Sequence, residues 1–111
     1  MKVHSTLGCG FMESVYHRSL EIELGKNNIC FQSEMEMPIY YEGIRVGSRR
    51  VDMFVEENVM LELKAVSKLD DVHIAQALNY LEAYNCEIGL LLNFGSKSLE
   101  IKRLLNKKVK K

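Results

Sequence analysis

The sequence contains no run of apolar residues that approaches the roughly 20 needed to cross a membrane. Its first residues, Met1-Lys2-Val3-His4, lack the apolar core of a secretory signal peptide. We therefore expect an intracellular, cytoplasmic protein with no membrane contact. The length of 111 residues suits one domain with a modest hydrophobic core.

The sequence has too few cysteines for disulfide bonds to stabilise the fold. Cys9, Cys30 and Cys86 are odd in number and form no CxxC pair, which argues against a disulfide framework or a zinc site and favours reduced core thiols. The sequence also has no Gly-rich phosphate loop, no internal repeat, and no Ser–His or Cys–His pairing that would supply a nucleophile.

An excess of either charge is also absent. Fifteen Lys and Arg balance fifteen Asp and Glu, so strong nonspecific binding of nucleic acid by the whole domain is not expected. Basic residues do gather at the end of the chain, where four of the last five residues are lysine. We expect one domain over residues 1–106 and a basic tail over residues 107–111, which is more simply a solvated end than a phosphate-binding arm.

The most informative stretch is residues 50–66, in which two alternating runs flank Glu56-Glu57-Asn58. Each run has a period of two and many β-branched or aliphatic residues, so each is predicted to be a strand. The polar break predicts a hairpin with Asn58 in the left-handed conformation.

The apolar residues of this hairpin predict its register. One face is wholly apolar if the pairs on it are Val55–Val59, Met53–Leu61 and Val51–Leu63. The pairs on the other face are then Phe54–Met60, Asp52–Glu62 and Arg50–Lys64. A shift by one residue would place Val51 opposite Lys64 and spoil the apolar face.

This register brings two carboxylates together. The Cβ atoms of Asp52 and Glu62 would lie roughly 5 Å apart, and like charges at that distance destabilise a sheet. Arg50 and Lys64 would offset the repulsion in a surface lattice of four charges. A divalent cation would offset it better, because one or two carboxylates, water and substrate phosphate are what Mg²⁺ prefers. Lys64, about 7 Å from Glu62 along the strand, would then be placed to contact a phosphate.

The remaining elements follow from periodicity and turn residues. Residues 11–27 and 71–84 are predicted helices, the second with Asp70 as its N-cap. Strands are predicted from residue 31, with Pro38 marking an edge strand or a strand irregularity, Glu42-Gly43 a tight turn and Gly47 a bulge. Residues 88–94 form a buried strand and residues 99–105 a last short helix. The order α-β-β-β-α-β-α predicts an α/β protein with a mixed sheet and helices on both faces.

Three motifs in this order resemble a known family. Residues 10–16 match the pattern GxxExxY, with Gly10, Glu13 and Tyr16. Asp52 followed by Glu62-Leu63-Lys64 is similar to the Asp and acidic-x-Lys core of the PD-(D/E)XK nuclease superfamily. Gln76 and Tyr80 resemble the Gln-x3-Tyr helix motif of its RecB-like branches. The sequence thus resembles the GxxExxY family of that superfamily over about residues 3–105, which implies a restriction-endonuclease-like core.

The resemblance implies a nuclease that needs Mg²⁺ or Mn²⁺ and acts on DNA more readily than on RNA. Asp52, Glu62 and the backbone carbonyl of Leu63 would hold the metal. Lys64 would position the attacking water or stabilise charge on the phosphate, Glu13 would complete the metal shell or act as base, and Gln76 and Tyr80 would point toward the carboxylates. The alternative is an inactive module of the same fold that binds nucleic acid or a protein partner, and a homodimer stays open.

Overall fold

A computed structural model of the chain describes residues 2–109 and contains one five-stranded sheet. The strands are β1 (Phe31–Tyr41), β2 (Ile44–Val55), β3 (Val59–Lys64), β4 (Ile88–Asn93) and β5 (Glu100–Leu105), in the order β1-β2-β3-β4-β5. Neighbouring strands are antiparallel except β3 and β4, which are parallel and joined through a helix. This mixed sheet confirms the predicted fold class.

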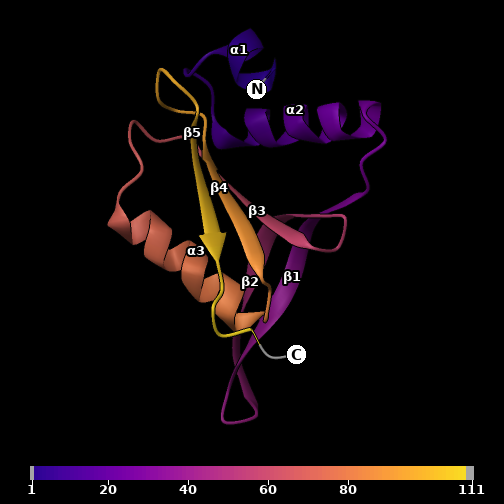
Figure 1. Ribbon diagram of the computed structural model, residues 1–111, viewed down its shortest axis with the longest axis vertical. Helices are drawn as coiled ribbons and strands as arrows, with labels where there is room; N and C mark the ends of the chain where they lie inside the picture. The colour runs from indigo at the N-terminus through magenta and orange to yellow at the C-terminus, as the bar shows by residue number, and fades with distance from the viewer. Residues whose placement is uncertain (1, 110–111) are drawn as a thin grey trace.

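Three helices cover the sheet: α1 (Lys2–Leu7), α2 (Glu13–Lys26) and α3 (Asp71–Ala83). Figure 1 shows α2 running across the strands near one end of the sheet with α1 beside it. Helix α3 packs on the opposite face of the sheet. Among the described residues, no helix is long and apolar enough to span a membrane.

The sheet separates two hydrophobic clusters. On the α2 side, Tyr16 and Leu20 of the helix pack against residues such as Met53, Leu61 and Leu63. On the α3 side, the buried residues are Val51, Met60, Ala77, Leu81, Leu91 and Leu104. The prediction of helices on both faces is therefore confirmed.

Several local predictions are also confirmed. Asp70 caps α3, and its carboxylate accepts hydrogen bonds from the backbone N–H groups of Val72 and His73. Glu42 and Gly43 both have positive φ and form the turn between β1 and β2. The bulge that was expected at Gly47 lies one residue earlier, since Gly47 pairs with Ile39 and Val46 is passed over.

The last predicted helix is wrong, because residues 100–105 form strand β5. This segment pairs along its whole length with β4 and satisfies the backbone groups that β4 would otherwise leave open at the sheet edge. Helix α1 was not predicted from the sequence. Cys9 and Cys30 are exposed, so only Cys86, which is half-buried, approaches the expected core position.

Two further predictions concerned the loop after β2 and the end of the chain. In the loop, Glu56 and Glu57 have the positive φ values of 55° and 60° rather than Asn58, and the N–H of Asn58 closes the turn onto the carbonyl of Val55. Of the expected tail, residues 110 and 111 lie outside the described residues.

Candidate active site

The pairing of β2 with β3 follows the predicted register and then stops early. Val55–Val59, Phe54–Met60 and Met53–Leu61 are paired as expected. Within the described part of the chain, the predicted Asp52–Glu62, Val51–Leu63 and Arg50–Lys64 pairs do not form. The two strands therefore part at the position of the acidic residues.

The carboxylate of Asp52 replaces the backbone acceptor that β2 does not provide for the N–H of Leu63. Its Oδ2 accepts a 2.8 Å hydrogen bond from the backbone N–H of Leu63. On the other side of β2, the pairing with β1 passes over Asp52 and Glu34, and Glu34 has φ 55°. Because the strand is irregular here, Val51 joins the cluster on the α3 side instead of continuing the apolar face with Met53.

Glu62 is the most deeply buried acidic residue of the site, with 3% of its surface exposed. Its Oε1 is buried and has no hydrogen-bond partner within the described residues. Burial, followed by the neighbouring charge of Asp52, raises the pKa of Glu62 to about 8. A protein without a bound cation therefore keeps this carboxyl group largely protonated at neutral pH.

Lys64 lies at the end of β3, where its backbone carbonyl accepts a 2.8 Å hydrogen bond from the N–H of Phe94. Its half-buried side chain acts on the two glutamates of the site, since its charge lowers the pKa values of both Glu13 and Glu62. The alternative surface lattice of Asp52, Glu62, Arg50 and Lys64 is not formed among these residues. Glu62 is buried, and Nη1 of Arg50 lies 4.0 Å from Oε1 of Glu34 instead.

Glu13 is brought to the site by Tyr16, three residues further along α2. The Tyr16 hydroxyl donates a 2.6 Å hydrogen bond to the carbonyl of Gly8 and accepts one from the N–H of Phe11, while its buried ring stacks on Phe94. These contacts fix the loop before α2 and hence the first turn of the helix. Desolvation, followed by the charge of Asp52, raises the pKa of Glu13.

Two hollows adjoin these residues. A cleft of about 370 Å³ lies between α2 and the first two strands; its lining residues are Glu13, Ser14, His17, Arg18, Glu21, Glu34, Arg50 and Asp52. A smaller gap lies between β3 and α3 and is lined by Glu62, Lys64, His73, Gln76, Ala77, Tyr80 and Leu91. The structure thus places Gln76 and Tyr80 beside Glu62 and Lys64, whereas Asp52 lines the larger cleft together with Glu13.

Arg49 is a site residue that the sequence did not reveal. Its Nη2 lies 3.9 Å from Oε2 of Glu62, and its guanidinium carbon lies 4.7 Å from the centre of the Tyr80 ring. The charge of Arg49 lowers the pKa of Glu62, opposing the effect of burial. One signal was present: Arg49 shares the period-two parity of Val51 and Met53, and a charge on a face predicted to be buried usually has a partner there.

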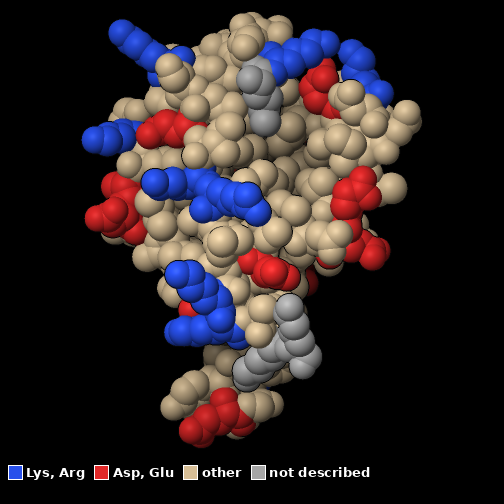
Figure 2. All heavy atoms as spheres, viewed as in Figure 1, with Lys and Arg blue, Asp and Glu red and all other residues tan. Residues whose placement is uncertain are grey.

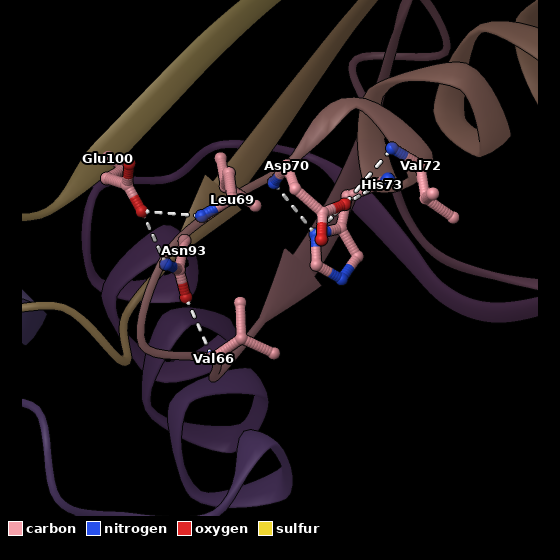
Figure 3. A network of polar contacts seen from close by, with 7 residues as sticks. All are labelled: Val66, Leu69, Asp70, Val72, His73, Asn93 and Glu100. Carbon is pink, nitrogen blue, oxygen red and sulfur yellow. Dashed lines mark hydrogen bonds and ion pairs between the residues drawn. The ribbon is translucent and has the colours of Figure 1, made fainter.

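A polar network holds the start of α3 against the sheet (Figure 3). Oδ1 of Asn93 accepts from the N–H of Val66, and its Nδ2 donates to Glu100, which also accepts from the N–H of Leu69. These hydrogen bonds lower the pKa of Glu100. The network fixes the connection between Lys64 and α3, and with it the helix that carries Gln76 and Tyr80.

The acidic residues fit a divalent cation. No group of three or more His, Cys, Asp and Glu side chains is gathered for a metal within residues 2–109. However, Mg²⁺ is commonly held by one or two carboxylates together with water. Asp52 and Glu62 supply two neighbouring carboxylates, and the partnerless Oε1 of Glu62 is a buried oxygen that a cation would satisfy.

Comparison with known proteins bears on the fold and the family. The chain is similar to the crystal structure of SSO0001, with a TM-score of 0.65 and 20% sequence identity over 85% of this chain. The match covers 50% of SSO0001, so this chain spans about half the length of that protein. No curated protein matches the chain.

The family model described as PD-(D/E)XK nuclease superfamily matches residues 1–104, which is nearly the whole chain. The match includes Asp52 and the Glu62-Leu63-Lys64 run. This protein belongs to the PD-(D/E)XK nuclease superfamily.

Proposed function

We propose that the protein is an active nuclease that hydrolyses phosphodiester bonds, in DNA in preference to RNA, with Mg²⁺ or Mn²⁺. The observation that carries this proposal is Glu62, a buried carboxyl group with a pKa of about 8 and an oxygen without a partner, held beside Asp52. Nucleases of this superfamily generally depend on a divalent metal ion. We also assign the chain to the GxxExxY family on Gly10, Glu13 and Tyr16.

Each residue of the site has a role in this proposal. Asp52, Glu62 and the backbone carbonyl of Leu63 would hold the ion, which acts as a Lewis acid and lowers the pKa of its bound water. Lys64 places a positive charge where the phosphate gains negative charge. Glu13, with its raised pKa, is suited to accept a proton at the mouth of the cleft.

Residues on α3 support this arrangement from the other side of β3. Gln76 and Tyr80 line the gap that contains Glu62 and Lys64, and the Tyr80 ring holds Arg49 near Glu62. We propose that these two residues keep the glutamate and the lysine oriented.

Cleavage of a labelled oligonucleotide tests the proposal. The parent should cleave single- or double-stranded DNA with Mg²⁺ or Mn²⁺ and stop in EDTA, and an RNA of the same sequence should be cut more slowly. Lys64→Ala should fold normally and lose activity by about 100- to 1000-fold, the usual effect of removing one group that stabilises transition-state charge. Lys97→Ala, which removes an exposed lysine from the loop after β4, is the matched control.

The rival hypothesis is a module of this fold without catalytic activity. The zero net charge of the chain and the lack of a ready three-ligand group within residues 2–109 favour it. Equal cleavage by the parent and Lys64→Ala would assign any activity to a contaminant, and no cleavage with either ion would favour the module.

Thermal melts separate a metal site from a pair of surface acids without any measure of activity. At a Mn²⁺ concentration a hundred times Kd, the parent should gain about 2.7 kcal/mol, a melting shift on the order of 10 °C for this size. Asp52→Asn should lose most of that gain. In EDTA at neutral pH the same variant should be close to neutral, because Glu62 is largely protonated there and the amide oxygen of the new side chain can still accept from the N–H of Leu63. A parent curve that Mn²⁺ does not move would contradict the metal site.

A further inference from the structure

The hairpin formed by β1 and β2 extends past the body of the protein as a narrow arm (Figure 1). All residues from 40 to 48, which we call the arm, are exposed. Four large apolar side chains stand on it with 60–68% of their surface exposed: Tyr40, Tyr41, Ile44 and Val46. Packing within the fold does not account for these side chains, and exposed apolar groups that cluster in this way commonly mark a binding surface.

The register of the hairpin places an aromatic ring and two arginines on one face. Tyr40 pairs with Arg45, and Glu36 pairs with Arg50. Tyr40 and Glu36 are four residues apart in β1 and so share a face. Arg45 and Arg50 are five residues apart, but the bulge at Val46 absorbs the extra residue and returns Arg45 to the same face.

This face leads to the candidate active site. Arg50 lines the same cleft as Asp52 and Glu13. Arg45 lies seven residues before Asp52 in β2, or roughly 23 Å along the strand at 3.3 Å per residue. Figure 2 shows basic side chains where the narrow projection joins the body and acidic ones at its tip. Along β2, Arg45 and Arg50 lie between the turn at the end of the arm and Asp52.

The chemistry of the face matches an unpaired nucleic-acid strand. Aromatic rings stack on bases that are not held in a duplex, and arginine guanidinium groups bind phosphates with two parallel hydrogen bonds. Arg50 is available for this role, since its 4.0 Å contact with Glu34 joins two side chains that are each about 60% exposed.

We propose that the arm binds a single-stranded segment of nucleic acid and directs it into the cleft at Asp52. Tyr40 stacks on a base, and Arg45 and Arg50 contact successive phosphates. This inference rests on the proposed function, because the polymer that enters the cleft is taken to be the substrate.

A second copy of this chain is the other occupant that an exposed β arm suggests, and two features of β1 disfavour it. The strand lies at the edge of the sheet, where another strand could add. Pro38 has no N–H to donate to an added strand, and the irregular backbone at Glu34, which has φ 55° and is passed over in the pairing with β2, interrupts the regular edge. Both features protect edge strands from pairing with other strands.

Binding in EDTA, where no metal-dependent cleavage occurs, tests the arm by itself. The full chain is titrated onto a fluorescein-labelled 30-nucleotide DNA strand, and fluorescence anisotropy gives Kd at several salt concentrations. Tyr40→Ala should weaken binding about 5- to 150-fold, the equivalent of one lost stacking contact. Tyr40→Phe, which keeps the ring, should bind like the parent. Arg45→Ala should reduce the slope of log K against log salt by about 0.7, the value of one phosphate contact on a single strand.

Two residues of β5, at the opposite edge of the sheet, supply matched controls. Ile101→Ala removes an apolar side chain that is 56% exposed, and Arg103→Ala removes an exposed positive charge. Both should bind like the parent, and all five variants alter exposed side chains, so their melting temperatures should match that of the parent.

Each contrary outcome overturns a stated part of the inference. Equal losses from Arg45→Ala and Arg103→Ala would mean diffuse attraction to positive charge, and tighter binding of a duplex of the same length would exclude the single-strand assignment. A dimer in sedimentation that Tyr40→Ala dissociates, without any change in DNA affinity, would assign the arm to a second copy. If binding depends on the arm but the protein never cleaves, the arm is confirmed as a binding surface and the proposed nuclease activity is refuted.

Discussion

Replacing Glu62 by glutamine should change the pH dependence of stability more than any other single change in the site. In the unfolded chain this carboxyl group ionises near 4.5, whereas in the folded protein burial and the charge of Asp52 raise its pKa to about 8. Below pH 4.5 both states carry the proton and the group has no effect. Between these values only the unfolded chain loses the proton, so the free energy of unfolding falls as pH rises until the folded protein ionises too.

The size of the effect follows from the two pKa values. Each pH unit between them costs about 1.4 kcal/mol. From pH 6 to pH 9 the parent should therefore lose roughly 3 kcal/mol from this group alone, since the loss ends near pH 8. For a domain of this size that is a fall in Tm on the order of 10 °C. Glu62→Gln carries no titrating group and keeps the shape of the protonated side chain, so it should escape this loss.

The assay is a set of thermal melts in EDTA at pH 6 and pH 9. The quantity of interest is the fall in Tm of the parent minus the fall in Tm of Glu62→Gln, because the subtraction removes the contribution of all other groups. Glu87→Gln, which changes an exposed glutamate, is the control and should fall as much as the parent. Equal falls for the parent and Glu62→Gln would mean that Glu62 is already ionised at pH 6, and the argument from burial would fail.

Two further substitutions test the packing that holds the site. Leu63→Ala should destabilise the protein by roughly 2–5 kcal/mol, because the side chain is fully buried between the sheet and α2, and an unchanged denaturation midpoint would show that the faces of β3 are wrongly assigned. Gly95→Ala should cost at least about 1–3 kcal/mol, because its Cβ would lie 2.4 Å from backbone atoms of Val66, which are held in place through Asn93. Gly25→Ala, where an added Cβ meets no atom within 4 Å, is the control for Gly95 and should leave the midpoint unchanged or higher.

Short-range features of the fold were predictable because their causes are local. Asp70 caps α3 with its own side chain, and Glu42-Gly43 reverses the chain between two strands. The register of Met53, Phe54 and Val55 with β3 followed from alternation and a short turn. In each case the deciding interaction joins residues that are close in the sequence.

Strand β5 was not predictable from the pattern of its own residues. Leu99, Ile101, Leu104 and Leu105 are compatible with a helix or a strand, and short apolar runs do not distinguish the two. Pairing with β4 decided the matter, because the edge of β4 needs partners for its backbone groups.

The sequence by itself determined that Asp52, Glu62 and Lys64 occur in an order and spacing that a hairpin brings together, and that α3 carries Gln76 and Tyr80 on one side. Only the tertiary structure decided how these groups are arranged. The strands part at Asp52 because its carboxylate binds the N–H of Leu63, which sends Val51 to the other core. The packing of α3 brings Tyr80 under Arg49 and buries Glu62, and burial, which no spacing along the chain encodes, is what raises the pKa of that carboxyl group.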